Sequence, residues 1–203
     1  MSRARRALAP ALVVLAGLAA VAGVAFAVVL HLSDALRRAL YPLLVASQTV
    51  PPVTIAPILV VWFGFGLGPK LVFVALICFF PITVNTLDGL RSVDPDLIKM
   101  MRTIGASRGQ ILLRGEGPSA LPFAFSGAKI AMAVAVIGAV FAEWAGSDSG
   151  LGHLILVSSS ELLTARMFAA VTVLSAMAIA LFGLIALAER RVVTWKGERG
   201  VTT

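Results

Sequence analysis

The chain has 203 residues, of which 59% are hydrophobic and only 13% are charged, and its mean hydropathy is +0.98. Soluble domains are about 45–50% apolar and about 25% charged, so this composition excludes a disordered chain, a disulfide-stapled secreted scaffold and almost any soluble enzyme domain. A lipid bilayer is the solvent that suits such a chain. The net charge of +7 does not indicate a nucleic-acid partner, because aromatic residues make up only 7% and the basic residues lie between apolar blocks.

The first two apolar stretches cover residues 8–31 and 43–66, and each is long enough to cross ~30 Å of hydrocarbon. The second stretch contains three polar residues at 47–49, followed by Pro51, Pro52 and Pro57. Proline cannot donate to the helical hydrogen-bond pattern, so we expect a helix to begin near Pro52 after a bent entry. The broken backbone should then face other helices or an aqueous path.

Three further apolar stretches cover residues 69–88, 119–144 and 166–188. The sequence has no internal repeat, low-complexity tract or linker. We therefore predict an all-α integral membrane protein, with residues 1–203 forming one domain of about five transmembrane helices.

The basic residues predict the orientation of these helices. Eleven of them lie in 32–42, in 89–118 and after Ala188, whereas Lys70 and Arg166 are alone on the opposite side. The positive-inside rule therefore places 89–118 and the C-terminus in the cytoplasm.

The N-terminus does not fit this orientation, because five spans would place Arg3, Arg5 and Arg6 outside. The chain lacks a first span that its relatives have, or 8–31 is re-entrant, or residues 1–30 are a signal peptide. An Ala-Phe-Ala sequence at 25–27 fits a signal peptide, but the apolar run exceeds the usual 7–15 residues. We favour a missing first span.

Residues 89–118 form the most informative segment. Asp94 and Pro95 suit the N-cap and first position of a helix. This helix would carry Leu97, Met101 and Ile104 on one face.

Gly105 suits a left-handed stop, and Ser107 suits the N-cap of a second short helix that carries Ile111 and Leu112. Two short amphipathic helices are too small to have a core of their own, so their apolar faces need either a partner groove or the bilayer surface.

The run DPDLIKMMRTIGASRGQILLRGEGPSALPFAFSGAKIA at 94–131 resembles the EAA loop of binding-protein-dependent ABC importer permeases. Gly105 and Pro118 have the spacing of that signature, and Gly105-Ala106-Ser107 is similar to its common turn. Residues 99–101 depart from its Glu-Ala-Ala, and glycines at 115 and 117 replace its Ile and Leu.

Three other segments resemble the nitrate/sulfonate/taurine branch of these permeases, which includes permeases for pyrimidine precursors of thiamine and for riboflavin. These are SQTVPPVTIAPILVVWFGFGLGPK at 47–70, FFPITVNTLDGLRSVDPDL at 79–97 and AEWAGSDSGLGHLI at 142–155. In all, the resemblance covers about residues 30–195.

The resemblance implies a MetI-like helical bundle of the type I importer class in the cell inner membrane. Such a permease pairs with a second permease copy, most simply as a homodimer, and receives its solute from a substrate-binding protein. Its cytoplasmic loop, here 89–118, docks as a coupling helix on a separate ABC ATPase subunit. The residues that the resemblance assigns to this docking are Asp96, Leu97, Met101, Ile104, Gly105, Ala106, Ser107, Ile111 and Pro118.

The resemblance also implies which molecules the chain does not bind itself. The sequence contains no Gly-x-x-x-x-Gly-Lys-Ser/Thr phosphate loop, so ATP and Mg²⁺ are expected on the partner ATPase and no cofactor on this chain. His31 and His153 lack companions at metal-ligand spacing, so no metal site is expected. For the solute, a thiamine-precursor pyrimidine is the first expectation, followed by sulfonate, taurine or nitrate.

Four polar residues inside the predicted spans are candidates for lining the solute path, namely Asn85, Thr86, Lys129 and Glu143. Structural roles are the alternatives. Glu143 could reach water beside the interfacial Trp144, Lys129 could extend to the headgroups, and Asn85 and Thr86 could bond between helices.

Two other functions are weighed against the permease. A membrane-embedded enzyme would use Glu143, Asp148 and His153 as acid and base groups, but the sequence offers no paired carboxylates or nucleophile–base set on neighbouring helical faces. A structural or signalling subunit would contain no path through it. The permease is the prediction, and the chain itself is expected not to be an enzyme.

Overall fold

A computed structural model describes the backbone of residues 2–195 and the side chains of residues 17–195. Within that part of the chain every regular element is a helix. In chain order these are α1 (Ser2–Leu32), α2 (Asp34–Ser47), α3 (Pro52–Phe63), α4 (Leu67–Arg91), α5 (Pro95–Thr103), α6 (Arg108–Ile111), the π-helical turn η1 (Leu112–Glu116), α7 (Gly117–Trp144), α8 (Leu151–Ser160) and α9 (Thr164–Val192).

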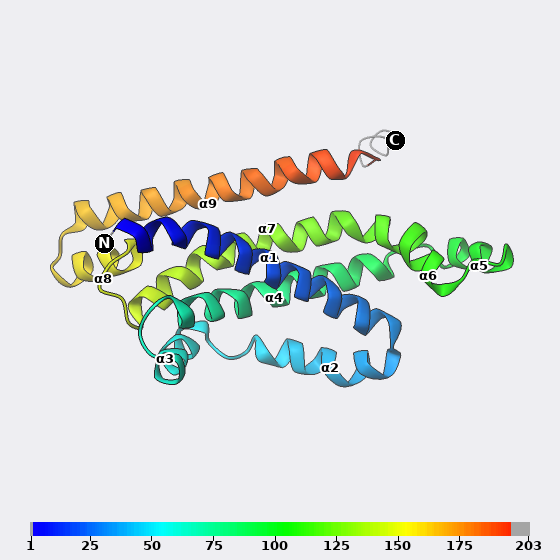
Figure 1. Cartoon of the computed structure of the whole chain (residues 1–203), viewed down its shortest axis with the longest axis horizontal. Helices are drawn as coiled ribbons and strands as arrows, with labels where there is room; N and C mark the ends of the chain where they lie inside the picture. Colours follow the sequence, from blue (N-terminus) through cyan, green and yellow to red (C-terminus); the bar gives the residue numbers. More distant parts are fainter. Residues whose placement is uncertain (1, 196–203) are drawn as a thin grey trace.

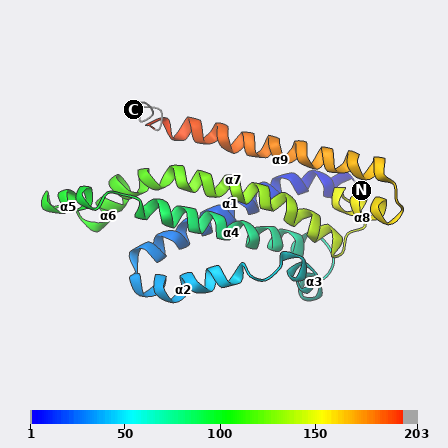
Figure 2. The same cartoon turned by 180° about the vertical axis from the view of Figure 1, so that it is seen from behind.

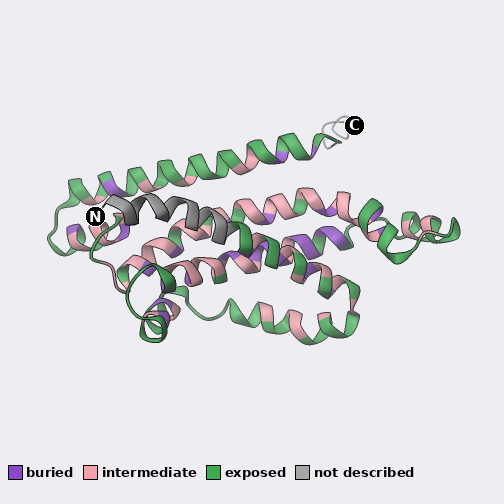
Figure 3. Ribbon diagram, viewed as in Figure 1, coloured by how far each residue is buried: buried purple, intermediate pink, exposed green. Residues whose placement is uncertain are grey.

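The antiparallel helices α4 and α7 form the centre of the bundle (Figures 1 and 2). Helix α1 packs along α4, and α9 packs against α7 and α8. Buried residues concentrate on α4, whereas α2 and α9 are mostly exposed (Figure 3). The outward surface of α9 is largely apolar, as expected for a helix that borders lipid or another membrane subunit.

Small residues bring α4 and α7 close together. A Cβ atom added to Gly127 of α7 would lie 2.7 Å from the Pro81 carbonyl oxygen and 3.0 Å from the Asn85 Cβ, both on α4. One added to Gly89 of α4 would lie 2.6 Å from the Phe123 Cβ on α7. Only glycine fits at these positions without a shift of the helices.

Three helices in the described part of the chain are long and apolar enough to cross a membrane: Leu67–Arg91, Arg108–Trp144 and Thr164–Val192. They confirm the predicted spans 69–88, 119–144 and 166–188. The predicted span 8–31 lies within α1, whose side chains before residue 17 are outside the described residues.

The predicted stretch 43–66 is broken, as its prolines indicated. Helix α2 ends at Ser47, α3 begins at Pro52, and the two are bent by 95°. Pro51 and Pro52 supply no N–H groups to donate to the carbonyls of residues 47 and 48, so α2 cannot continue. The Ala46 carbonyl accepts from both the backbone N–H (3.0 Å) and the hydroxyl (2.7 Å) of Thr49. The expectation of a helix that begins near Pro52 after a bend is confirmed.

The two ends of the bundle carry different elements. Helices α5 and α6 and the C-terminal end of α9 lie at one end, whereas α3, α8 and the start of α1 lie at the other (Figures 1 and 2). The loop 89–118 therefore shares an end with the last turn of α9, as the charge pattern predicted. Because α1 starts at the opposite end, the conflict between the positive-inside rule and the basic N-terminus persists in this fold.

Candidate functional site

Helix α5 projects beyond the bundle (Figure 1), and it begins at the N-cap that the sequence predicted. The Asp94 side chain accepts a hydrogen bond from the Asp96 N–H (2.8 Å), and Pro95 occupies the first turn of α5. After α5, Gly105 has φ +82°, in the left-handed region that favours glycine. This conformation turns the chain back from α5 toward the bundle (Figure 1).

Ser107 then starts the next helix through a capping box. Its hydroxyl accepts from the Gln110 N–H (3.3 Å), and the Gln110 side chain accepts from the Ser107 N–H (2.8 Å). The predicted N-cap at Ser107 is therefore confirmed.

The expectation of a separate second short helix is wrong. Helix α6 continues through η1 into α7, so residues 108–144 form one continuous helix. The Gly117 N–H donates to the Leu112 carbonyl, which is the hydrogen bond of a π turn. Pro118 follows in the first turn of α7 and is half-buried there. A proline in the first turn interrupts no hydrogen bond within α7.

An apolar face of α5 points away from the chain. Leu97 is 40% exposed and Met100 56%, and Ile104, the C-cap residue directly after α5, is 75% exposed. Their i, i+3, i+7 spacing places them on one side. We call these three residues the exposed α5 face. Sequence reasoning did not select Met100 as a site residue, although its spacing from Leu97 and Ile104 was a usable signal.

The other residues assigned to docking are divided between surface and interior. Asp96 is exposed and pairs with Lys99 (2.8 Å), and Ala106 is half-buried. Met101 is half-buried, with its sulfur 3.1 Å from where a Cβ of Gly115 would be, so it anchors α5 to η1. The Ile111 side chain is only 4% exposed and packs inside the chain rather than on the exposed α5 face.

Glu143 caps the start of α8 from the end of α7. Its Oε2 accepts from the Gly152 N–H (2.6 Å) and the His153 N–H (3.3 Å), and the neighbouring Trp144 indole N–H donates to the Gly152 carbonyl (2.9 Å). These bonds place a carboxylate at a helix N-terminus, where the helix dipole favours negative charge. Among residues 17–195, neither the Asp148 side chain nor the His153 imidazole hydrogen-bonds to this carboxylate.

Lys129 and Glu189 form an ion pair that connects α7 to α9. The two side chains are 22% and 11% exposed, and the Lys129 Nζ also lies 5.8 Å from the centre of the Phe182 ring. Charges inside a membrane protein are costly unless they are paired. Sequence reasoning selected Lys129 but missed Glu189, which is 60 residues away in the chain.

Asn85 and Thr86 lie on α4 but differ in their surroundings. The Asn85 side-chain amide donates to the Pro81 carbonyl of its own helix (2.8 Å). Thr86 is 2% exposed and its hydroxyl has no hydrogen-bond partner among the described residues, as is also true of Thr83 one turn earlier. The structure therefore does not gather Asn85, Thr86, Lys129 and Glu143 at one site.

Residues 13–194 match the family described as binding-protein-dependent transport system inner membrane component. The chain belongs to this family. Its members are transport components rather than enzymes, so the permease prediction is confirmed over the enzyme alternative.

The relatives fall in the predicted nitrate/sulfonate/taurine branch. The chain is 37% identical to the formylaminopyrimidine transport permease ThiX of Halalkalibacterium halodurans, over 90% of this chain and 73% of that protein. It is 40% identical to the riboflavin permease RibX of Chloroflexus aurantiacus (80% and 61%) and 34% identical to the taurine permease TauC of Escherichia coli (87% and 64%). The chain thus spans less than two thirds of the length of the last two.

A solved structure of the MetNI methionine ABC transporter has the same fold, with a TM-score of 0.70 over 96% of this chain and 98% of that chain at 19% identity. The predicted MetI-like architecture is therefore confirmed.

Proposed function

We propose that this chain is the permease subunit of an ATP-driven importer and that the exposed α5 face docks on a separate ABC ATPase subunit. The observation that carries the proposal is the exposure of Leu97, Met100 and Ile104 on a helix that projects beyond the bundle. An amphipathic helix with a free apolar face suits a groove on a partner protein. ATP and Mg²⁺ belong to that partner.

The packing around α5 supports a route for force. Met101 holds α5 against η1, and η1 is continuous with α7. A push on α5 would therefore act on the whole of Arg108–Trp144, and through the Lys129–Glu189 pair on α9. This route couples closure of the ATPase to movement of the membrane helices.

The end of the bundle that carries α5 is proposed to be cytoplasmic. Arg37, Arg91 and Arg190 all lie on helices that start or end there, in accordance with the positive-inside rule. On this assignment α3 and α8 face outward, where a substrate-binding protein delivers the solute.

We further infer a second permease copy as partner, most simply in a homodimer, because one chain leaves α9 almost unburied. The solute class is taken from the relatives. A pyrimidine precursor of thiamine is the first choice because ThiX is named as a formylaminopyrimidine permease, and sulfonate, taurine or nitrate come next.

The docking proposal is tested by placing one negative charge on either side of α5. Ile104→Asp introduces the charge on the exposed α5 face at the C-cap, and Thr103→Asp introduces it one residue earlier, at the last residue of α5 and on another side. Each permease variant is co-expressed with its nucleotide-binding subunit and purified through a tag on the permease.

We expect the amount of copurified ATPase to fall more than tenfold with Ile104→Asp and to stay unchanged with Thr103→Asp. The reason is that burying an unpaired charge in the interface costs more than the ~1.4 kcal/mol that corresponds to a tenfold change in affinity. Both permeases should melt at the same temperature, since both positions are exposed. Equal retention of the ATPase by the two variants contradicts the proposal.

A further inference from the structure

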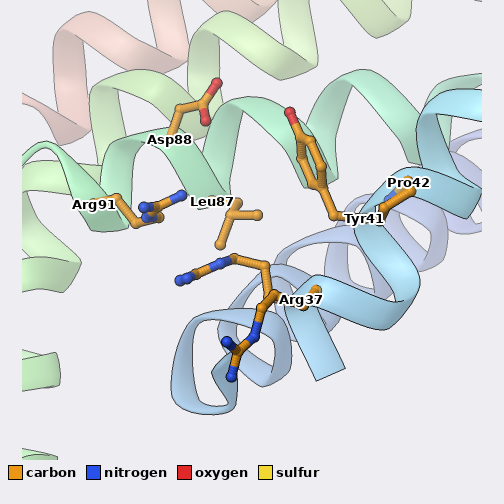
Figure 4. Close-up of a pocket in the computed structure, with 7 residues that line it drawn as sticks. Arg37, Tyr41, Pro42, Leu87, Asp88 and Arg91 are labelled. Carbon is orange, nitrogen blue, oxygen red and sulfur yellow. The ribbon is translucent and has the colours of Figure 1, made fainter. Parts of the chain in front are cut away.

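A basic pocket lies between α2 and the C-terminal turns of α4, in a region that the proposed coupling mechanism does not use. It has a volume of about 320 Å³. We call it the α2–α4 pocket. The residues that give it its chemistry are Arg37, Arg38, Tyr41, Leu87, Asp88 and Arg91 (Figure 4).

Positive charge exceeds negative charge in this pocket. Arg37 and Arg38 come from α2, and Arg91 lines the pocket from α4; Figure 4 shows Arg37 and Arg91 on the two helices. Asp88 is the one carboxylate that lines the pocket among the described residues. Asp34 pairs with Arg37 (2.8 Å) and fixes its position, yet three guanidinium groups still exceed the two carboxylates.

The donors suit a phosphate group. A guanidinium group binds phosphate oxygens through two parallel N–H donors, and arginines on two helices can hold one phosphate from both sides. The Tyr41 hydroxyl adds a further donor at the pocket wall.

The position of the pocket favours a lipid over a free ion. Arg91 is the last residue of α4, so the pocket lies where this span leaves the hydrocarbon region. Leu43 and Val45, which follow the pocket residues on α2, are 64% and 45% exposed. A lipid whose headgroup occupies the pocket can place its acyl chains against these residues, which a free phosphate cannot use.

We propose that the α2–α4 pocket binds the phosphate headgroup of an anionic membrane lipid. The inference rests on the proposed membrane placement of the chain. Excess arginine selects a headgroup with net negative charge, such as phosphatidylglycerol, over a zwitterionic one whose ammonium group would approach the same arginines. The bound lipid neutralises the repulsion between Arg37, Arg38 and Arg91 and thereby holds α2 against α4.

The test is a titration of the purified permease–ATPase complex with short-chain phosphatidylglycerol, with bound lipid counted by native mass spectrometry. The double variant R37Q/R91Q removes one arginine from each wall of the pocket. R190Q/R191Q is the control, because it removes two arginines from the same end of the bundle outside the pocket.

R37Q/R91Q is expected to weaken phosphatidylglycerol binding roughly thirtyfold, and R190Q/R191Q to leave it within about twofold. The single variant R38Q should weaken binding less, by about fivefold, and it repeats the test at an exposed residue. Equal binding by wild type and R37Q/R91Q, or an equal loss in the control, overturns the proposal.

Two further arms identify the ligand. Short-chain phosphatidylcholine is expected to bind at least tenfold more weakly, and inorganic phosphate alone is expected not to displace phosphatidylglycerol. Displacement by inorganic phosphate would instead assign the pocket to a free anion. The amount of ATPase in each preparation is read separately, so loss of lipid from an intact complex cannot be confused with failure of the permease proposal.

Discussion

Glu143 is an acidic residue at the end of a membrane segment, and its carboxylate connects α7 to α8. Its carboxylate is held by the backbone N–H groups of Gly152 and His153, and the adjacent Trp144 binds the Gly152 carbonyl. These three bonds fix α8 across the end of α7. We therefore interpret Glu143 as a positioning residue for the end of the bundle that is proposed to face outward.

Glu143→Gln should lower the thermal stability of the permease. The amide retains one acceptor oxygen but loses the charge that the N-terminus of α8 favours, which costs about 1 kcal/mol. Glu161→Gln is the matched control at the opposite end of α8, where the carboxylate is exposed. Melting of both variants in detergent is the measurement, and a Glu143→Gln protein that melts like wild type but no longer transports would indicate a solute-path role instead.

The residues predicted well from sequence are those whose partners are close in the chain. Asp94 and Ser107 cap helices through hydrogen bonds to residues two or three positions away, and Gly105 makes a turn through its own φ angle. Residue type and order were therefore enough to predict their roles. The Lys129–Glu189 pair joins positions 60 residues apart. No local pattern encodes that contact, because it depends on how α9 packs against α7.

At the scale of elements, the contact between α4 and α7 determines the core. The backbones of these helices approach at Gly127, where a Cβ would meet backbone atoms of Pro81 and Ile82. Backbone atoms in two packed helices cannot move aside as a flexible side chain can. A methyl group at position 127 should therefore destabilise the packing of α4 against α7.

Gly127→Ala is expected to destabilise the permease by about 1–3 kcal/mol through overpacking. Gly183→Ala is the control in α9, where a Cβ meets nothing within 4 Å and alanine improves helix propensity by up to about 1 kcal/mol. The two variants should shift the melting temperature in opposite directions or leave Gly183→Ala unchanged. An equal decrease in both would show that the α4–α7 approach is not special.

Helix boundaries were predictable from long apolar runs and from the paired prolines at 51 and 52, but not at 115–118. Residues 43–66 have the length and composition of a span, yet the two prolines divide it at a 95° bend. At 115–118 the opposite happened, because η1 lets the helix pass two glycines and Pro118 without a break. Composition alone does not distinguish these outcomes, which depend on the hydrogen-bond pattern around each proline.

The proposed importer function assigns different partners to the two ends of the bundle. One end carries the exposed α5 face and the end of α9, and the other carries α3, α8 and the exposed Leu162 between α8 and α9. In the proposed importer only the first end contacts an ATPase. The sequence pattern indicated that the loop 89–118 has apolar residues in need of a partner. Which of them are exposed, and at which end of the bundle they lie, depends on the fold.

Photo-crosslinking in the assembled, membrane-embedded complex shows whether α5 is the surface that contacts the ATPase. A benzophenone amino acid is placed at Met100, which is 56% exposed on α5, and at Leu162, which is 83% exposed at the opposite end. We expect a permease–ATPase adduct from position 100 and none from position 162. An intact, transporting complex in which position 100 crosslinks only to lipid, or in which position 162 crosslinks to the ATPase, would contradict the docking proposal.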